Sequence, residues 1–109
     1  MIYLASPLSD PSGLVMRDRF QAACRQAAKM MRDGLTVCSP VAHSYWIALY
    51  GRIGLTDHDF WQRMDRPFLE ACDEVWVLKL PGWDTSKGVA AEIALARELG
   101  KEVTFVDAS

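Results

Sequence analysis

Four short apolar runs alternate along the chain with segments whose apolar residues recur at helical spacing, and this alternation constrains the fold most strongly. We predict strands at 2–5, 35–38, 74–80 and 103–106 and helices at 14–32, 57–72 and 87–99. Strands that alternate with helices form parallel sheets covered on both faces. With right-handed crossovers, the simplest solution is one domain over residues 1–109. It would have a three-layer, flavodoxin-like or Rossmann-like α/β fold with four to five parallel strands in the order 2-1-3-4.

Turn and capping residues mark the ends of the predicted helices. Gly34 ends the first helix and Gly100 the last, since glycine suits the position just after a helix. Thr56 is the expected N-cap of the middle helix, and Pro67 is expected to kink or restart it. The segment 41–56 is rich in aromatic residues, and we expect it to be partly helical and to pack in the core or at an interface.

Charge and composition exclude several classes of partner. The 109 residues carry a net charge of -2 and their positive charges are scattered, which argues against binding a nucleic acid polymer. No run approaches the ~20 apolar residues that a membrane span needs, and no secretory signal is evident at the start. We therefore expect a cytoplasmic protein without membrane association. Cys24, Cys38 and Cys72 lie far apart and are interpreted as small buried hydrophobic residues in a reducing compartment.

Metal and cofactor signals are weak. His43 and His58 are single histidines without metal-ligand spacing, so no metal site is expected. No glycine-rich nucleotide motif occurs, and a flavin or nicotinamide would need a more distinct phosphate-binding loop than residues 6–13 offer. We expect no cofactor. In a sheet of this order, ligands bind beyond the carboxyl ends of strands 1 and 3, where the loops 6–13 and 81–86 meet.

Glu92 breaks the pattern of the last helix. On a helical wheel, five small or apolar residues lie within about 60° of it, namely Gly88, Val89, Leu95, Ala96 and Leu99. A charge in a buried stripe violates binary patterning and indicates a functional or strained site. Because Glu92 also lies near the loop after strand 3, we favour a functional carboxylate over a buried ion pair or a loop cap. Asp65 also breaks the apolar pattern of its helix. A role as the N-cap of a helix that restarts near Pro67 explains its position equally well.

The start of the same helix is a candidate anion site. Ser86 is a natural N-cap, and free backbone N–H groups with the helix dipole favour a phosphate there. Gly88 would let a ligand approach the backbone closely. Each of these features is common at helix starts, so taken alone it is only weak evidence for an anion site.

Taken in order, these residues resemble the nucleoside 2-deoxyribosyltransferase superfamily, which includes nucleoside 5′-monophosphate N-glycosidases. The resemblance begins at Ile2-Tyr3-Leu4-Ala5-Ser6 and continues through Asp65 and the segment 69–78. It is strongest at Asp84-Thr85-Ser86-Lys87-Gly88-Val89-Ala90-Ala91-Glu92, followed by Ala96 and Gly100-Lys101-Glu102-Val103. It covers most of the chain except the aromatic segment 41–56.

The resemblance implies an enzyme that cleaves or transfers across the N-glycosidic bond of a nucleoside or nucleotide. Glu92 would be the nucleophile, positioned by Tyr3, and Asp65 and Asp84 would handle protons on the departing base. Ser86 would contact a 5′-phosphate, and Ser6 and Ser9 would add contacts from the first loop. The family also implies a homodimer or homotetramer. Two alternatives stay open: a non-catalytic nucleotide-binding or sensing module, and a structural protein with a vestigial pocket.

Overall fold

The structure is a computed structural model and describes residues 1–108. Its elements follow one another in the predicted alternation of strands and helices. In chain order they are β1 (Ile2–Ala5), α1 (Gly13–Arg32), β2 (Val37–Cys38), α2 (Pro40–Gly51), α3 (His58–Ala71), β3 (Glu74–Lys79), a 3-10 helix η1 (Trp83–Thr85), α4 (Lys87–Glu98) and β4 (Val103–Asp107). No helix among the described residues is long and apolar enough to cross a membrane.

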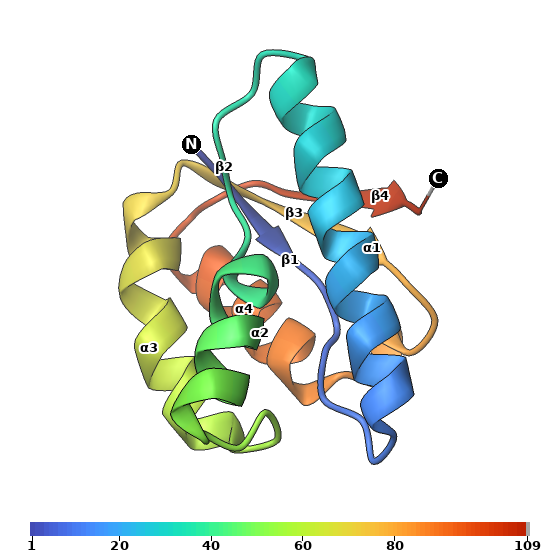
Figure 1. Ribbon diagram of the computed structural model, residues 1–109. Helices are drawn as coiled ribbons and strands as arrows, with labels where there is room; N and C mark the ends of the chain where they lie inside the picture. The colour runs from blue at the N-terminus through green and yellow to red at the C-terminus, as the bar shows by residue number, and fades with distance from the viewer. Residues whose placement is uncertain (109) are drawn as a thin grey trace.

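The four strands form one parallel sheet in the order β2-β1-β3-β4. This confirms the predicted fold class and strand order. Helix α1 covers one face of the sheet, and α3 and α4 lie on the other side (Figure 1). β1 and β3 are neighbours, so the loops that follow them leave the sheet at the same end. The predicted ligand crevice therefore lies at the lower end of the molecule in Figure 1.

Alternate residues of β1 enter different layers of the core. Tyr3 packs in a cluster with residues of α3, β3 and α4, including Leu69, Val75 and Val89. Leu4 packs in the other cluster, against Met30 of α1 and other apolar residues. Because successive strand residues point to opposite faces, a strand buried on both sides must be apolar throughout. All four β1 residues are buried, so the one hydroxyl among them, that of Tyr3, is enclosed in the core.

Two details of the sequence prediction were wrong, and one of the two alternatives at Pro67, a restart of the helix, is excluded. β2 contains only Val37 and Cys38, because this edge strand pairs with β1 at just those two positions. The N-cap of α3 is Asp57, whose carboxylate accepts from the Phe60 N–H at 3.3 Å, rather than Thr56. α3 continues through Pro67 without restarting. Proline lacks the N–H that would donate to the carbonyl four residues earlier, which belongs to Arg63, an exposed residue.

The aromatic segment forms α2, which packs beside α1. The Tyr45 ring stacks on Phe20 at 4.3 Å between centroids, and Trp46 meets both rings edge-on. Tyr45 is buried, as expected for a core role, whereas Trp46 and Tyr50 are exposed. The cysteines are unpaired; Cys72 is buried as predicted, and Cys24 and Cys38 are half-buried.

Lys101 closes the C-terminal end of α3. Its ammonium donates to the backbone carbonyls of Leu69 at 2.9 Å and Glu70 at 2.6 Å, and also to that of Cys72. These carbonyls have few helical partners, and a cation there also complements the helix dipole. We expect Lys101→Met to lower the free energy of unfolding by about 2 kcal/mol in urea titrations.

The matched control is Lys79→Met. Lys79 makes an exposed ion pair with Asp107 at 3.1 Å, and such pairs contribute roughly 0–1 kcal/mol. Equal losses in the two variants would show that the three carbonyl contacts of Lys101 add no stability beyond that of a surface charge.

Candidate active site

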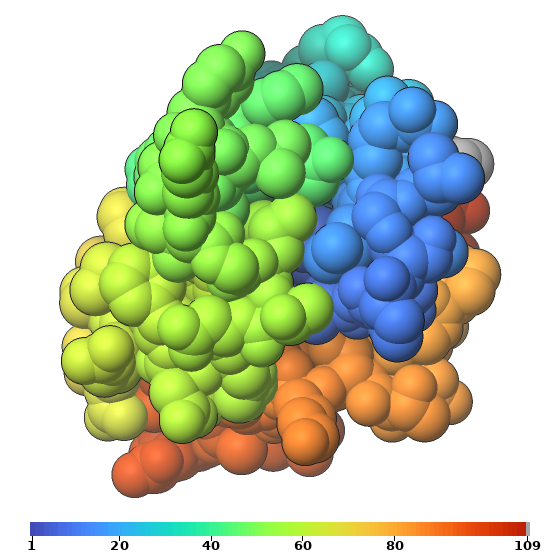
Figure 2. Space-filling view, turned by 60° about the horizontal axis from the view of Figure 1, so that its bottom comes forward, coloured from blue at the N-terminus to red at the C-terminus, as the bar shows by residue number. Residues whose placement is uncertain are grey.

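A cleft of about 900 Å³ opens at the carboxyl ends of β1 and β3, where the topology predicts a ligand. This volume is within the roughly 300–1,000 Å³ of small-molecule sites. Figure 2 views the molecule from this end, where the β1–α1 loop and the start of α1 (blue), the α2–α3 region (green to yellow) and the start of α4 (orange) meet. The polar side chains in its wall are those of Ser6, Ser9, Ser44, Thr56, His58, Asp59, Trp61, Gln62, Arg63, Asp65, Arg66, Thr85, Ser86, Lys87, Glu92 and Glu98.

Glu92 lies in the wall of this cleft, one and a half turns into α4. The pKa of its carboxyl is raised to about 8: burial raises it most, the nearby Tyr3 hydroxyl lowers it in part, and the charge of Asp65 adds a smaller rise. The Tyr3 hydroxyl is buried and forms no hydrogen bond of regular geometry within residues 1–108. The hydroxyl nevertheless lies near the Glu92 carboxyl, since each of the two groups shifts the pKa of the other. Burial raises the pKa of Tyr3 far above its usual value, so its proton stays in place as a donor.

Asp65 faces the same cleft from α3. Burial raises the pKa of its carboxyl to about 6. Because α3 is continuous through this residue, Asp65 does not cap a helix, and the second of its two interpretations is excluded. Its charge acts on Glu92, so the two carboxyls form an interacting pair on adjacent helices. Such a pair holds one proton across the pH range between its two apparent pKa values.

The predicted serines of the first loop also line the cleft, in different ways. The Ser6 hydroxyl is buried and has no hydrogen-bond partner in the described part of the chain. A buried polar group without a partner is costly, so a polar ligand atom would be favourable there. The Ser9 hydroxyl instead donates to the Leu55 carbonyl at 3.1 Å. It therefore ties the β1–α1 loop to the α2–α3 loop across the mouth of the cleft.

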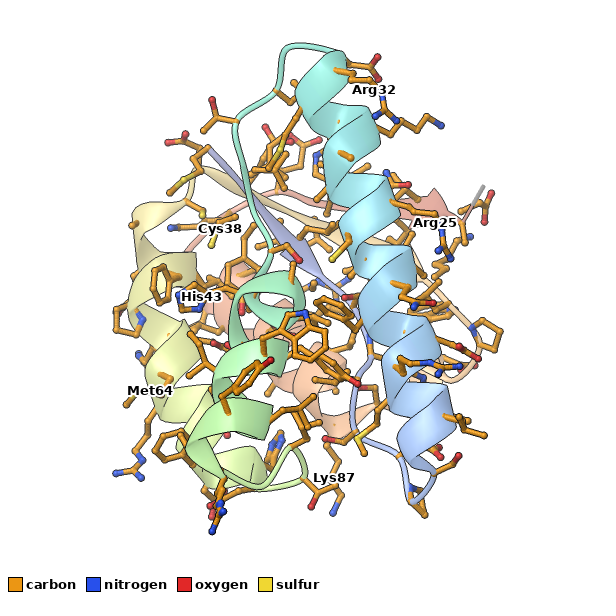
Figure 3. All side chains as sticks on the ribbon, viewed as in Figure 1. Arg25, Arg32, Cys38, His43, Met64 and Lys87 are labelled. Atoms are coloured by element: carbon orange, nitrogen blue, oxygen red, sulfur yellow. The ribbon has the colours of Figure 1, made fainter. Side chains whose placement is uncertain are left out.

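The start of α4 matches its prediction. The Ser86 hydroxyl accepts from the Val89 N–H at 3.2 Å, so it is the N-cap. Gly88 lines the cleft, and a Cβ at that position would meet only Ser86 Oγ at 3.9 Å. Packing therefore does not require glycine at position 88. Figure 3 shows Lys87 at this end of the molecule, whereas Arg25 and Arg32 lie along α1 away from it.

Asp84 is separate from the other predicted site residues. It lies in η1, is exposed and is not part of the cleft wall. The structure therefore brings together Glu92, Asp65, Tyr3 and the predicted serines but leaves Asp84 at the surface. Its resemblance-based role would require the segment 81–86 to move inward.

Arg19 holds the two loops of the crevice together, and no pattern in the sequence indicated this role. Its guanidinium donates to the carbonyls of Ser9 at 2.9 Å, Leu8 at 3.3 Å and Pro81 at 3.1 Å. Gly82 makes room for it, since a Cβ there would lie 2.5 Å from an Arg19 nitrogen. Gly82 also has a φ of +91°, a conformation that favours glycine. Arg19 thus fixes the loop that carries Ser6 relative to the loop that leads into α4.

Residues 1–108 contain no cluster of three or more His, Cys, Asp or Glu side chains that could hold a metal ion. Comparison with curated proteins finds no match. The family described as "Domain of unknown function (DUF1937)" matches residues 1–108, so the chain belongs to that family.

Proposed function

We propose that this protein cleaves the N-glycosidic bond of a nucleoside or nucleoside 5′-monophosphate, by hydrolysis or by transfer of the sugar to another base. The observation that carries the proposal is the pair of partly buried carboxyls, Glu92 and Asp65, facing one cleft of nucleotide size. Their pKa values are both raised, and perturbed pairs of this kind occur mainly at functional sites. The resemblance to nucleoside 2-deoxyribosyltransferases supports the same assignment for Glu92, Asp65 and Tyr3, but not for Asp84, which lies outside the cleft.

In the proposed reaction the two carboxyls act at opposite ends of one bond. A Glu92 carboxylate oxygen bonds to the anomeric carbon as the C–N bond breaks, and Asp65 delivers a proton to the departing base. Water or a second base then attacks the anomeric carbon, gives up a proton to the now ionised Asp65, and displaces Glu92 as a carboxylate. The Tyr3 hydroxyl acts as a positioning group by donating to the Glu92 carboxylate. The helix start at Ser86 and Gly88, with the Lys87 ammonium, suits the 5′ end of the substrate.

The protonation of the pair predicts the pH dependence. The reaction needs one proton on the pair: an ionised Glu92 and a protonated Asp65. Since the pKa values are about 6 for Asp65 and about 8 for Glu92, the singly protonated pair is most populated between these two pH values, with its proton mainly on Glu92. The reactive form, in which Asp65 holds that proton, is a minor fraction of the singly protonated pair and rises and falls with the same pH dependence. We expect kcat/KM to follow a bell-shaped curve with limbs near pH 6 and pH 8. A curve that stays level from pH 5 to 9 would contradict a reaction that uses this pair.

A nucleotide-binding module without catalysis is the second candidate. Two observations favour it: the exposed position of Asp84 and a Glu92 pKa that leaves this carboxyl mostly protonated near pH 7. Such a module would keep the cleft and its anion site and release no base. It would show ligand-dependent thermal stabilisation without a product.

The test is incubation of the purified protein with a panel of nucleosides and 5′-monophosphates, followed by chromatography of the free bases. We expect base release from at least one class, and its absence in Glu92→Ala. Base release that survives in Glu92→Ala would refute the proposed role of Glu92. No release from any substrate, combined with thermal stabilisation by the same compounds, would establish the binding module instead.

A further inference from the structure

We infer that Trp61 is the platform on which the substrate's base stacks, which fixes the direction in which the substrate lies in the cleft. This inference deepens the proposed function and rests on it for the identity of the ligand. Trp61 lies in the first turn of α3, lines the cleft and is only half-buried. It is absent from both hydrophobic core clusters of the described residues, so core packing does not account for it.

The indole of Trp61 is held in place on two sides. Its N–H donates to the Gly54 carbonyl at 2.8 Å, and the Phe60 ring meets it edge-on at 4.9 Å. The neighbouring Leu55 carbonyl accepts from Ser9, so the loop that holds the indole is itself tied across the cleft. A ring fixed before the ligand arrives loses little conformational entropy on binding, and this favours stacking.

Trp61 and Asp65 are one helical turn apart on α3, and both line the cleft. Residues at this spacing share a helix face. A base stacked on Trp61 would therefore lie beside the carboxyl that the proposed reaction uses to protonate it. Gln62, also in the cleft wall, adds an amide that can pair with the edge of a base. The sugar would then extend toward Glu92 and the start of α4.

The simplest alternative is that Trp61 only anchors the α2–α3 loop through its N–H. Two substitutions separate the alternatives. Trp61→Phe keeps an aromatic face and loses the bond to Gly54, whereas Trp61→Leu loses both. Stacking predicts that Trp61→Phe stays close to wild type and Trp61→Leu does not, while a pure anchor predicts that both fail equally.

The experiment measures the dissociation constants of free adenine and free cytosine by calorimetry, with 2-deoxyribose as a ligand that cannot stack. We expect Trp61→Leu to weaken base binding about 10- to 100-fold, with less than about a threefold change in Trp61→Phe. Binding of 2-deoxyribose should be the same in all variants. Trp46→Leu, an exposed aromatic residue on α2 outside the cleft wall, is the matched control for general effects on the fold.

Equal base binding by wild type and Trp61→Leu would overturn the inference, as would equal losses in both variants or no base binding by the wild type. The proposed function fails separately. If no nucleoside is cleaved but bases bind in a Trp61-dependent way, the stacking site stands without the reaction. If bases are released and Trp61→Leu leaves KM unchanged, the reaction stands without the stacking site.

Discussion

Glu92→Gln is expected to make the protein more stable than wild type at alkaline pH, an effect that does not depend on any catalytic role. In the folded protein, burial raises the pKa of the Glu92 carboxyl from its ordinary value of 4.5 to about 8. A group whose pKa is higher in the folded state contributes stability below the unfolded pKa and loses it as the pH rises through the folded pKa. The wild type should therefore lose stability between about pH 4.5 and pH 8 as this buried carboxyl ionises.

Glutamine has nearly the same shape and carries no charge at any pH, so this loss should disappear in the variant. We expect Glu92→Gln to be close to wild type at pH 5 and more stable by on the order of 3–5 kcal/mol at pH 9. The measurement is urea unfolding across this range. Glu102→Gln is the control because it makes the same chemical change at an exposed residue of the α4–β4 connection. If both variants follow the wild-type pH dependence, Glu92 is not buried as described.

The sheet and its ligand end could be predicted because each rests on local patterns. The strands β1, β3 and β4 are short apolar runs bounded by turns, and the alternation with helices then determined their parallel order. β2 was overestimated because the apolar pattern includes Leu35 and Thr36, whereas pairing with β1 extends over two positions.

The sequence predicted only those residues of the candidate site that stand out within the pattern of a single helix or loop. Glu92 stands out on the wheel of α4, but the wheel of α3 could not separate a cleft carboxyl at Asp65 from a cap, since a proline follows closely. Arg19 and Lys101 have their roles through backbone carbonyls of distant segments. Any residue has a carbonyl, so such partners leave no trace in the sequence. Asp84 is adjacent in sequence to a residue of the cleft wall, so the sequence did not show that its own side chain lies outside the cleft.

The largest expected effect is on the proposed catalysis. The rates of the Glu92 and Asp65 variants should depend differently on which substrate is used. Glu92→Gln removes the proposed nucleophile, and we expect kcat to fall by about 10³-fold or more on every substrate. Asp65→Asn removes the proposed acid, and we expect a fall of about 10²- to 10⁴-fold on ordinary nucleosides. The proton from Asp65 matters only while the base needs one to depart. A nucleoside with an already cationic base, such as 7-methylguanosine, should therefore recover most of its rate in Asp65→Asn and none in Glu92→Gln.

This difference separates chemistry from damage to the fold, because a misfolded variant cannot recover on one substrate alone. Glu102→Gln, the exposed carboxyl used above, should retain wild-type kcat on both substrates. If 7-methylguanosine rescues neither variant, Asp65 is not the acid, and its raised pKa reflects burial beside Glu92 without a role in proton transfer. If it rescues both, Glu92 acts by donating a proton, which agrees with a carboxyl whose pKa is about 8, and the nucleophile must be sought elsewhere in the cleft.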